Sequence, residues 1–94
     1  MSYFLCRLNT PRPTFAQNIS ARERNMMMQH TGYWTKILHE GRAELFGSVG
    51  DPSGVRGTVI LNVDDLDAAK QLTADDPVIW SRIVFIYVAG RRAL

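Results

Sequence analysis

The chain has 94 residues, of which 46% are hydrophobic and 21% charged, so it fits one globular domain over residues 1–94 and excludes a disordered or fibrous protein. Eleven lysines and arginines are offset by nine acidic residues, for a net charge of +2, and they are scattered along the chain, so we expect no nucleic-acid partner. No apolar run approaches the roughly 20 residues of a membrane span, and Arg7 interrupts the N-terminal apolar stretch, so we expect a cytoplasmic protein without a membrane partner.

The first half of the chain predicts a strand, a loop and a helix. Residues 3–8 alternate in polarity as a strand does. Residues 9–19 are polar and contain two prolines, which predicts an ordered loop of a length that is often functional. Ser20 and Glu23 form a capping box that starts a helix, and Gly41 is the residue type that ends it after residue 40.

The second half predicts a hairpin, a short helix and a last strand. The expected ranges are 43–50 and 57–63 for the hairpin strands with turn residues at 51–54, Asp64 or Asp65 to before Pro77 for the helix, and 83–88 for the last strand. This last strand is apolar on both faces, so both faces require cover. Arg91 and Arg92 read as a solvated C-terminal tail.

This order of elements predicts an α+β fold. Strand, helix, strand, strand, helix, strand is the split βαβ or ferredoxin-like βαββαβ arrangement, with an antiparallel four-stranded sheet. Its two helices cover one sheet face, which leaves the other face open to water in a monomer. A second copy of the chain is the economical cover, and a domain this small gains from the added burial.

His30 is the leading candidate functional residue. It lies in an apolar helical stripe with Met26, Tyr33 and Ile37, where an imidazole requires a polar partner. Asp76, in an Asp-Pro step, is the candidate partner. The simpler alternatives are a core-edge histidine bonded to a backbone carbonyl, and an aspartate that caps a turn starting at the following proline.

Several segments together resemble the YciI-like (YCII-related) family. They are Gln29-His30-Thr31-Gly32-Tyr33-Trp34, Glu40-Gly41-Arg42, Leu45-Phe46-Gly47-Ser48-Val49, Asp51-Pro52-Ser53-Gly54, Ala74-Asp75-Asp76-Pro77 and the Pro-Arg-Pro-Thr-Phe loop at residues 11–15. The resemblance implies a dimeric α+β barrel similar in fold to muconolactone isomerases and small monooxygenase-like domains. One branch of the family includes a dechlorinating muconolactone enzyme, and most members have no assigned reaction. The family's proposed active pair, a helix histidine and an aspartate before a proline, matches His30 and Asp76.

The chemistry expected of this pair is proton transfer. If Asp76 accepts a hydrogen bond from one ring nitrogen of His30, the other nitrogen is left as a general base or acid. Isomerisation of a lactone, elimination of a leaving group or proton abstraction beside a carbonyl would suit it, on a small organic acid or lactone, without a metal or organic cofactor. The alternatives are a non-catalytic small-molecule-binding or interaction module, and a structural dimer whose cleft is filled by its own side chains.

Some further residues are candidates for ligand binding. Phe15, Tyr33 and Trp34 are the aromatic residues expected near a ligand, and Arg7 is a candidate anion partner. Methionines 26–28 could line an adaptable pocket, although core packing is the favoured interpretation for most of them.

The remaining cysteine and histidine predict no further chemistry. Cys6 lies in the apolar register of its strand, which favours inert packing, and as the only cysteine it forms no intrachain disulfide. His39 lies on the opposite helix face from His30, so the two cannot share a metal ion. We therefore expect no metal site, and a homodimer or a higher assembly with a small-molecule ligand.

Overall fold

The computed structural model describes residues 2–51, 54–80 and 86–93. Its elements, in chain order, are β1 (Ser2–Asn9), α1 (Ala21–His39), β2 (Ala43–Asp51), β3 (Gly54–Val63), α2 (Leu66–Ala74), α3 (Pro77–Trp80) and β4 (Ile86–Ala93). The α+β class predicted from the sequence is confirmed, with α3 as an added turn of helix after α2.

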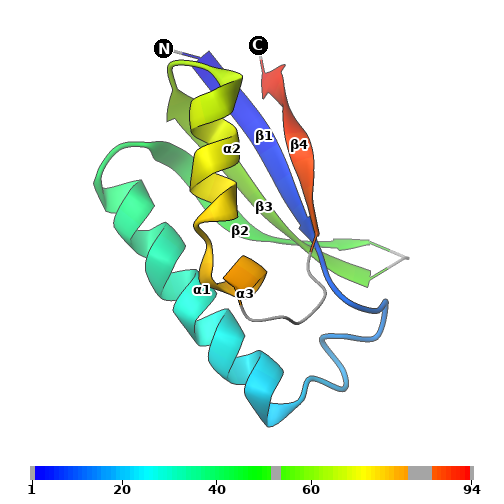
Figure 1. Cartoon of the computed structure of the whole chain (residues 1–94). Coiled ribbons are helices and arrows are strands. Elements are labelled where there is room, and N and C mark those ends of the chain that lie inside the picture. Colours follow the sequence, from blue (N-terminus) through cyan, green and yellow to red (C-terminus); the bar gives the residue numbers. More distant parts are fainter. Residues whose placement is uncertain (1, 52–53, 81–85, 94) are drawn as a thin grey trace.

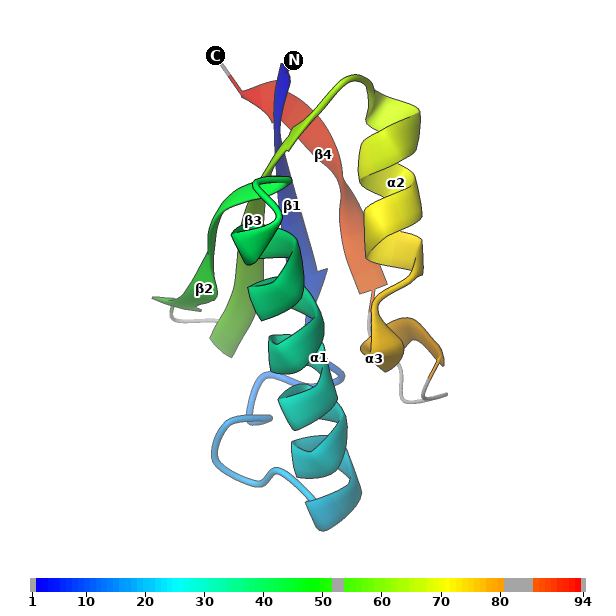
Figure 2. The same cartoon turned by 90° about the vertical axis from the view of Figure 1, so that its left-hand side faces the viewer.

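The strands form an antiparallel sheet in the order β2-β3-β1-β4. The helices α1 and α2 lie on the same side of this sheet (Figure 1), and the view turned by 90° shows α3 below α2 and next to α1 (Figure 2). β1 therefore occupies a central position, with β3 and β4 as its neighbours.

Successive side chains of β1 point alternately to the face of the sheet that the helices cover and to the open face. Phe4, Cys6 and Leu8 are buried against the helices, as their alternation predicts. Cys6 is buried within the core. The main core fills the space between the sheet and the two helices and comprises Phe4, Cys6, Trp34, Ile37, Ala43, Val59, Leu61, Val63, Ala69 and Leu72.

The ends of α1 follow the predicted capping signals. Ser20 Oγ accepts from the Glu23 amide at 3.1 Å, and Glu23 Oε1 accepts from the Ser20 amide at 2.9 Å, which completes the capping box. At the other end Gly41 adopts φ 81°, a left-handed conformation that closes the helix. The start and end of α1 are thus fixed by local sequence.

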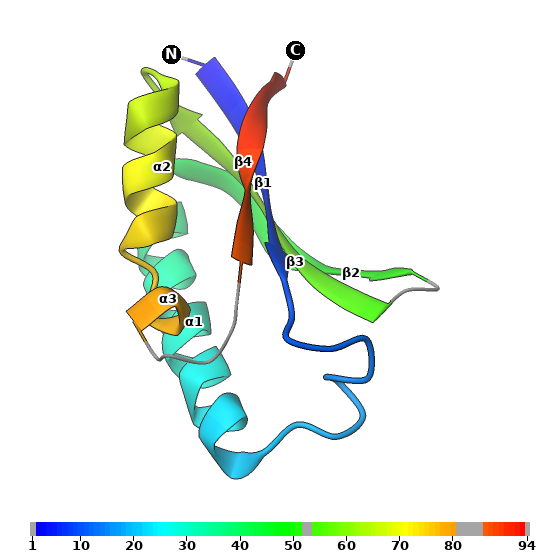
Figure 3. The same ribbon diagram turned by 45° about the vertical axis from the view of Figure 1, so that its right-hand side comes forward.

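Arg12 ties the loop between β1 and α1 to the start of α1. Its guanidinium donates to both carboxylate oxygens of Glu23 at 2.7 and 2.8 Å, and also to the side chain and backbone carbonyl of Asn18. Arg12 also lies 5.5 Å from the ring centroid of Phe15. Figure 3 shows this loop turning away from the end of β1 and returning to α1. It is an ordered loop, as predicted.

A second small core lies beneath this loop. Phe15 packs with Leu8 from β1 and Val78 from α3, and Met26 and Met27 of α1 pack against them. The loop is therefore held by apolar packing on its inner side and by the Arg12 ion pair on its outer side. The loop is thus packed against β1, α1 and α3.

Two strand boundaries differ from the sequence prediction by more than one residue. β3 starts at Gly54, not residue 57, because Gly54 to Arg56 continue the ladder with β2. β4 runs to Ala93, and Arg91 and Arg92 pair with Leu5 and Phe4. The strand thus continues past residue 88, where the sequence predicted its end, because β1 offers these residues backbone partners. The expected strand residues 83–85 lie outside the described residues.

Apolar side chains also lie on the open face of the sheet. Tyr3, Leu5 and Leu45 are 44%, 39% and 55% exposed, and Ile60 pairs with both leucines across the strands. Cross-strand partners point to the same side of a sheet. We call this group, Tyr3, Leu5, Leu45 and Ile60, the open-face patch.

Glu23 should make the fold sensitive to acid. The Arg12 guanidinium, followed by the Ser20 amide, lowers the pKa of Glu23 from its ordinary 4.5 to about 2. A lowered folded pKa means that the stabilisation is complete above the ordinary value and is lost as the pH falls toward about 2. We expect the difference in urea midpoint between the wild type and Glu23→Gln to shrink as the pH is lowered from above 4.5 toward about 2.

Arg12→Gln provides the matched comparison. It removes the largest cause of the lowered pKa, so it should remove most of the same pH dependence. A difference between the wild type and Glu23→Gln that stays constant down to about pH 2 would contradict this account.

Candidate functional site

His30 reaches from the middle of α1 toward the sheet. The buried residues of α1 include His30, Trp34 and Ile37, which recur at helical spacing. His30 is only 4% exposed. An imidazole buried to this extent requires a hydrogen-bond partner, because its ring nitrogens lose their contact with water.

Asp76 is this partner, and it is fully buried. His30 Nδ1 lies 2.6 Å from Asp76 Oδ2, across 46 positions of sequence. Trp34 Nε1 donates to the same oxygen at 2.8 Å, and the Val78 amide donates to Oδ1 at 3.1 Å. An ionised carboxylate is an acceptor only, so it matches these N–H donors when Nδ1 carries the proton.

Local sequence places Asp76 at this point. α2 ends at Ala74 with Asp75 as its C-cap, and Pro77 starts α3, so Asp76 occupies the junction between the two helices. Its bond to the Val78 amide is the cap that the Asp-Pro step predicts. Asp76 therefore caps α3 and binds His30 at once, which were the two interpretations left open by the sequence.

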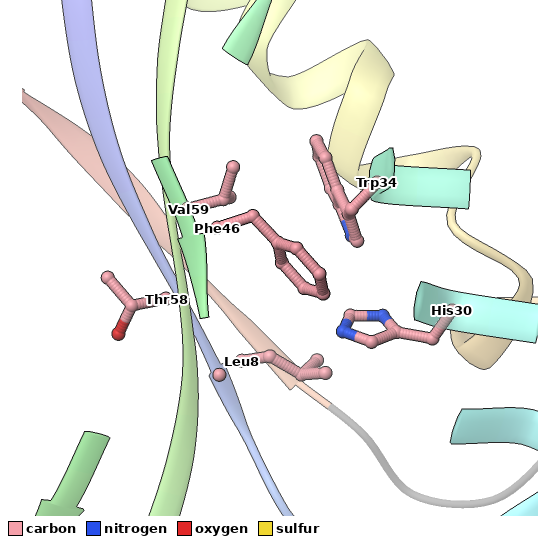
Figure 4. Close-up of a pocket in the computed structure, with 7 residues that line it drawn as sticks. Leu8, His30, Trp34, Phe46, Thr58 and Val59 are labelled. Carbon is pink, nitrogen blue, oxygen red and sulfur yellow. The ribbon is translucent and has the colours of Figure 1, made fainter. Parts of the chain in front are cut away.

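Sheet residues surround the other side of the His30 ring. Figure 4 shows the ring between Trp34 and Leu8, with the Phe46 ring facing it and Thr58 pointing away. The Phe46 and His30 rings meet edge to face, with centroids 5.7 Å apart. The hollow directly between the His30 ring and β3 leaves no space for a water molecule.

A larger cavity opens beside this hollow. Its volume is about 420 Å³, within the usual range of small-molecule sites, and His30 lies on its wall. The loop contributes Thr10, Phe15, Ala16 and Ile19, the helix α1 contributes Met27, His30 and Thr31, and the sheet contributes Leu8, Phe46, Gly47, Ser48 and Gly57. Asp76 thus holds one ring nitrogen of His30, and His30 also lines this cavity.

Phe15 and Trp34 lie close to the predicted site, and Tyr33 lies farther from it. Phe15 lines the cavity, whereas Trp34 borders only the narrow hollow and binds Asp76. The Tyr33 hydroxyl donates to the Leu72 carbonyl at 2.6 Å. Burial, with a smaller contribution from Asp75 and Asp76, raises the pKa of Tyr33 to about 12. Tyr33 is thus a hydrogen-bonded core residue in this structure.

Arg7 lies on the opposite side of the sheet from His30. It follows the exposed positions of β1, whereas the covered positions face α1. The structure therefore does not bring Arg7 to the cavity beside His30. Its role as an anion partner stays a prediction.

Sequence reasoning missed several cavity residues. Phe46 and Ser48 come from β2, and Thr10 and Ile19 come from the two ends of the loop. The Leu45-Phe46-Gly47-Ser48-Val49 segment carried part of the family resemblance, which was the available signal. Spacing within one element could not show that β2 and the loop meet at His30.

The histidines, cysteine and acids form no evident metal site in the described residues. No group of three or more such side chains lies close enough to hold a metal ion there. His39 is exposed near the end of α1. Within residues 2–51, 54–80 and 86–93, no helix is long and apolar enough to cross a membrane.

The fold and the buried pair define an α+β domain with a histidine–aspartate pair beside a cavity. A family model described as the YCII-related domain matches residues 3–88. The chain therefore belongs to the YCII-related family, as the sequence resemblance indicates. No curated protein matches the chain.

Removing the Asp76 carboxylate should destabilise the fold strongly. Asp76→Ala would leave the N–H donors of His30, Trp34 and Val78 buried without their acceptor. We expect a loss of about 3–5 kcal/mol in the free energy of unfolding, measured by urea denaturation.

The neighbouring residue gives a matched control. Asp75 is exposed and accepts from the Gln71 side chain, so Asp75→Ala should cost less than about 1 kcal/mol. Equal losses for the two variants would show that the buried hydrogen bonds contribute little.

Proposed function

We propose that the chain is an acid–base enzyme, isomerase-like or lyase-like, acting on a small organic acid or lactone without a metal or organic cofactor. His30 transfers the proton, and Asp76 orients it. The observation that carries the proposal is the 2.6 Å contact between His30 Nδ1 and Asp76 Oδ2 at the wall of a cavity of about 420 Å³.

The proposed step uses Nε2 of His30. With the proton of the neutral ring on Nδ1, the lone pair of Nε2 takes a proton from a carbon beside a carbonyl group. The imidazolium that forms is stabilised by the Asp76 carboxylate, and it returns the proton to another carbon or to a leaving group. Such a step covers lactone isomerisation, elimination and dehalogenase-like chemistry.

The alternative is a non-catalytic module that binds a small molecule in the same cavity. The position of Phe46 favours it, because its ring packs against His30 and the hollow beside β3 has no free space. A substrate would have to enter from the loop side, where the larger cavity lies. A binding module would need no such approach to Nε2.

The His30 tautomer tests the pair directly. Long-range ¹H–¹⁵N correlations of the neutral ring should place the proton on Nδ1 in the wild type, because Asp76 accepts it. Asp76→Asn should weaken this preference, because the amide is a poorer acceptor than the carboxylate. The exposed His39 ring serves as the reference and should not respond. A proton on Nε2 in the wild type, or a His30 ring unaffected by Asp76→Asn, would contradict the proposal.

Deuterium exchange separates the enzyme from the binding module. α-Angelica lactone has an acidic C–H beside its carbonyl, and in D₂O a general base would speed deuterium incorporation there by about 10²-fold or more. We expect this acceleration with the wild type and its loss in His30→Gln. Binding of the lactone without accelerated exchange would favour the alternative function.

We further propose that a cytoplasmic homodimer, or a higher assembly built from it, covers the open face of the ferredoxin-like sheet, as in a dimeric α+β barrel. The sheet order β2-β3-β1-β4 and the open-face patch support this. A second copy presents the same apolar surface, so two patches bury each other in an isologous contact.

A charge on the open-face patch tests the dimer. Leu5→Arg should shift the chain toward monomer in analytical ultracentrifugation, because it would bury an unpaired charge. Leu38 on α1 is the control, because it is 37% exposed and Leu5 is 39% exposed. Leu38→Arg should leave the molecular mass measured in the ultracentrifuge unchanged. A wild-type monomer at high concentration, or a dimer unaffected by Leu5→Arg, would refute the proposal.

A further inference from the structure

We infer that the cavity beside His30 selects an electrically neutral, largely apolar ligand, such as a lactone, over the corresponding carboxylate. The inference rests on the proposed function and narrows its substrate class. It follows from the charges around the cavity, and the family match does not specify it.

Among the described residues that line the cavity, none is a lysine, an arginine or an acid. Leu8, Phe15 and Met27 supply apolar walls, and the described polar side chains besides His30 are the hydroxyls of Thr10, Thr31 and Ser48. A carboxylate placed among them would lose its hydration and gain no cationic partner. Burying an anion without such a partner is strongly unfavourable.

The pair itself supplies no net positive charge. A neutral His30 beside an ionised Asp76 gives a net charge of −1, which repels an anion. Protonation of His30 brings the pair only to zero. A neutral carbonyl or an acidic C–H can approach Nε2 in either state without an uncompensated charge.

Arg12, the cationic residue of the loop between β1 and α1, is already bound in an ion pair. Arg12 is bound to both oxygens of Glu23 and to Asn18, on the outer side of the loop. Arg24 borders a neighbouring hollow that shares Met27 and Thr31 with the cavity, but Arg24 does not line the cavity itself. Neither arginine therefore lines the cavity beside His30.

A matched ligand pair tests this selectivity. Phthalide is a neutral lactone, and 2-(hydroxymethyl)benzoate is its ring-opened carboxylate. We expect phthalide to perturb the amide signals of Met27, Thr31 and Phe46 in ¹H–¹⁵N spectra of the whole protein. We expect its Kd to be at least about ten-fold lower than that of the carboxylate.

A new cation should weaken the preference for the neutral ligand. Thr31→Lys places an ammonium at the cavity wall and should tighten carboxylate binding about five-fold or more. Thr35→Lys, one turn farther along α1 and outside the lining, is the control and should leave both affinities unchanged.

Three results would overturn the inference. They are carboxylate binding as tight as phthalide binding in the wild type, the absence of any perturbation by phthalide at the cavity, and a Thr35→Lys effect equal to that of Thr31→Lys. If deuterium exchange by His30 persists while the charge preference fails, the proposed function stands and this inference alone falls. If exchange fails while phthalide is still preferred, the cavity is a neutral-ligand binding site without catalysis.

Discussion

The contact between His30 and Asp76 is the constraint on which the site depends. It joins the middle of α1 to the junction of α2 and α3, across 46 positions of sequence. Trp34 donates to the same carboxylate oxygen, so α1 is attached to this junction through two side chains one turn apart. A buried carboxylate requires such donors, and these donors in turn fix the rotation of α1 against the sheet.

The cavity wall is connected to Asp76 through Val78. The Val78 amide donates to the Asp76 side chain, which caps α3. The Val78 side chain packs against Phe15 and Leu8. Phe15 in turn lines the cavity, and Arg12 holds its loop to Glu23 at the start of α1. The part of the cavity wall that Phe15 forms is therefore coupled through Val78 to the aspartate that binds His30. A displacement of the loop would disturb packing at Val78, next to the cap of Asp76.

The elements of this fold were predictable where the signal is local. The capping box at Ser20 and the alternation in β1 are fixed by neighbouring residues, and the structure follows them. The end of β4 was not predictable, because Arg91 and Arg92 join the sheet only through pairing with β1. The same holds for the cavity, since Phe46 meets His30 only after β2 has paired in the sheet. His30 stood out as a polar residue in an apolar stripe, and the family resemblance indicated Asp76 as its partner, because no local pattern joins positions 30 and 76.

The two faces of the sheet carry different features, because the core and the cavity lie on the covered face and the open-face patch lies on the other. Along β1 the covered positions build the core and end at Leu8 beside the cavity, while the exposed positions carry Leu5 and Arg7. A shift of register by one residue would exchange these two sets. The pairing of Leu8 with Gly57 opposes such a shift, because a Cβ at position 57 would lie 3.2 Å from the Leu8 Cβ. Only glycine leaves room for Leu8 there without displacement, so this pair fixes both the cavity wall and the face on which Arg7 emerges.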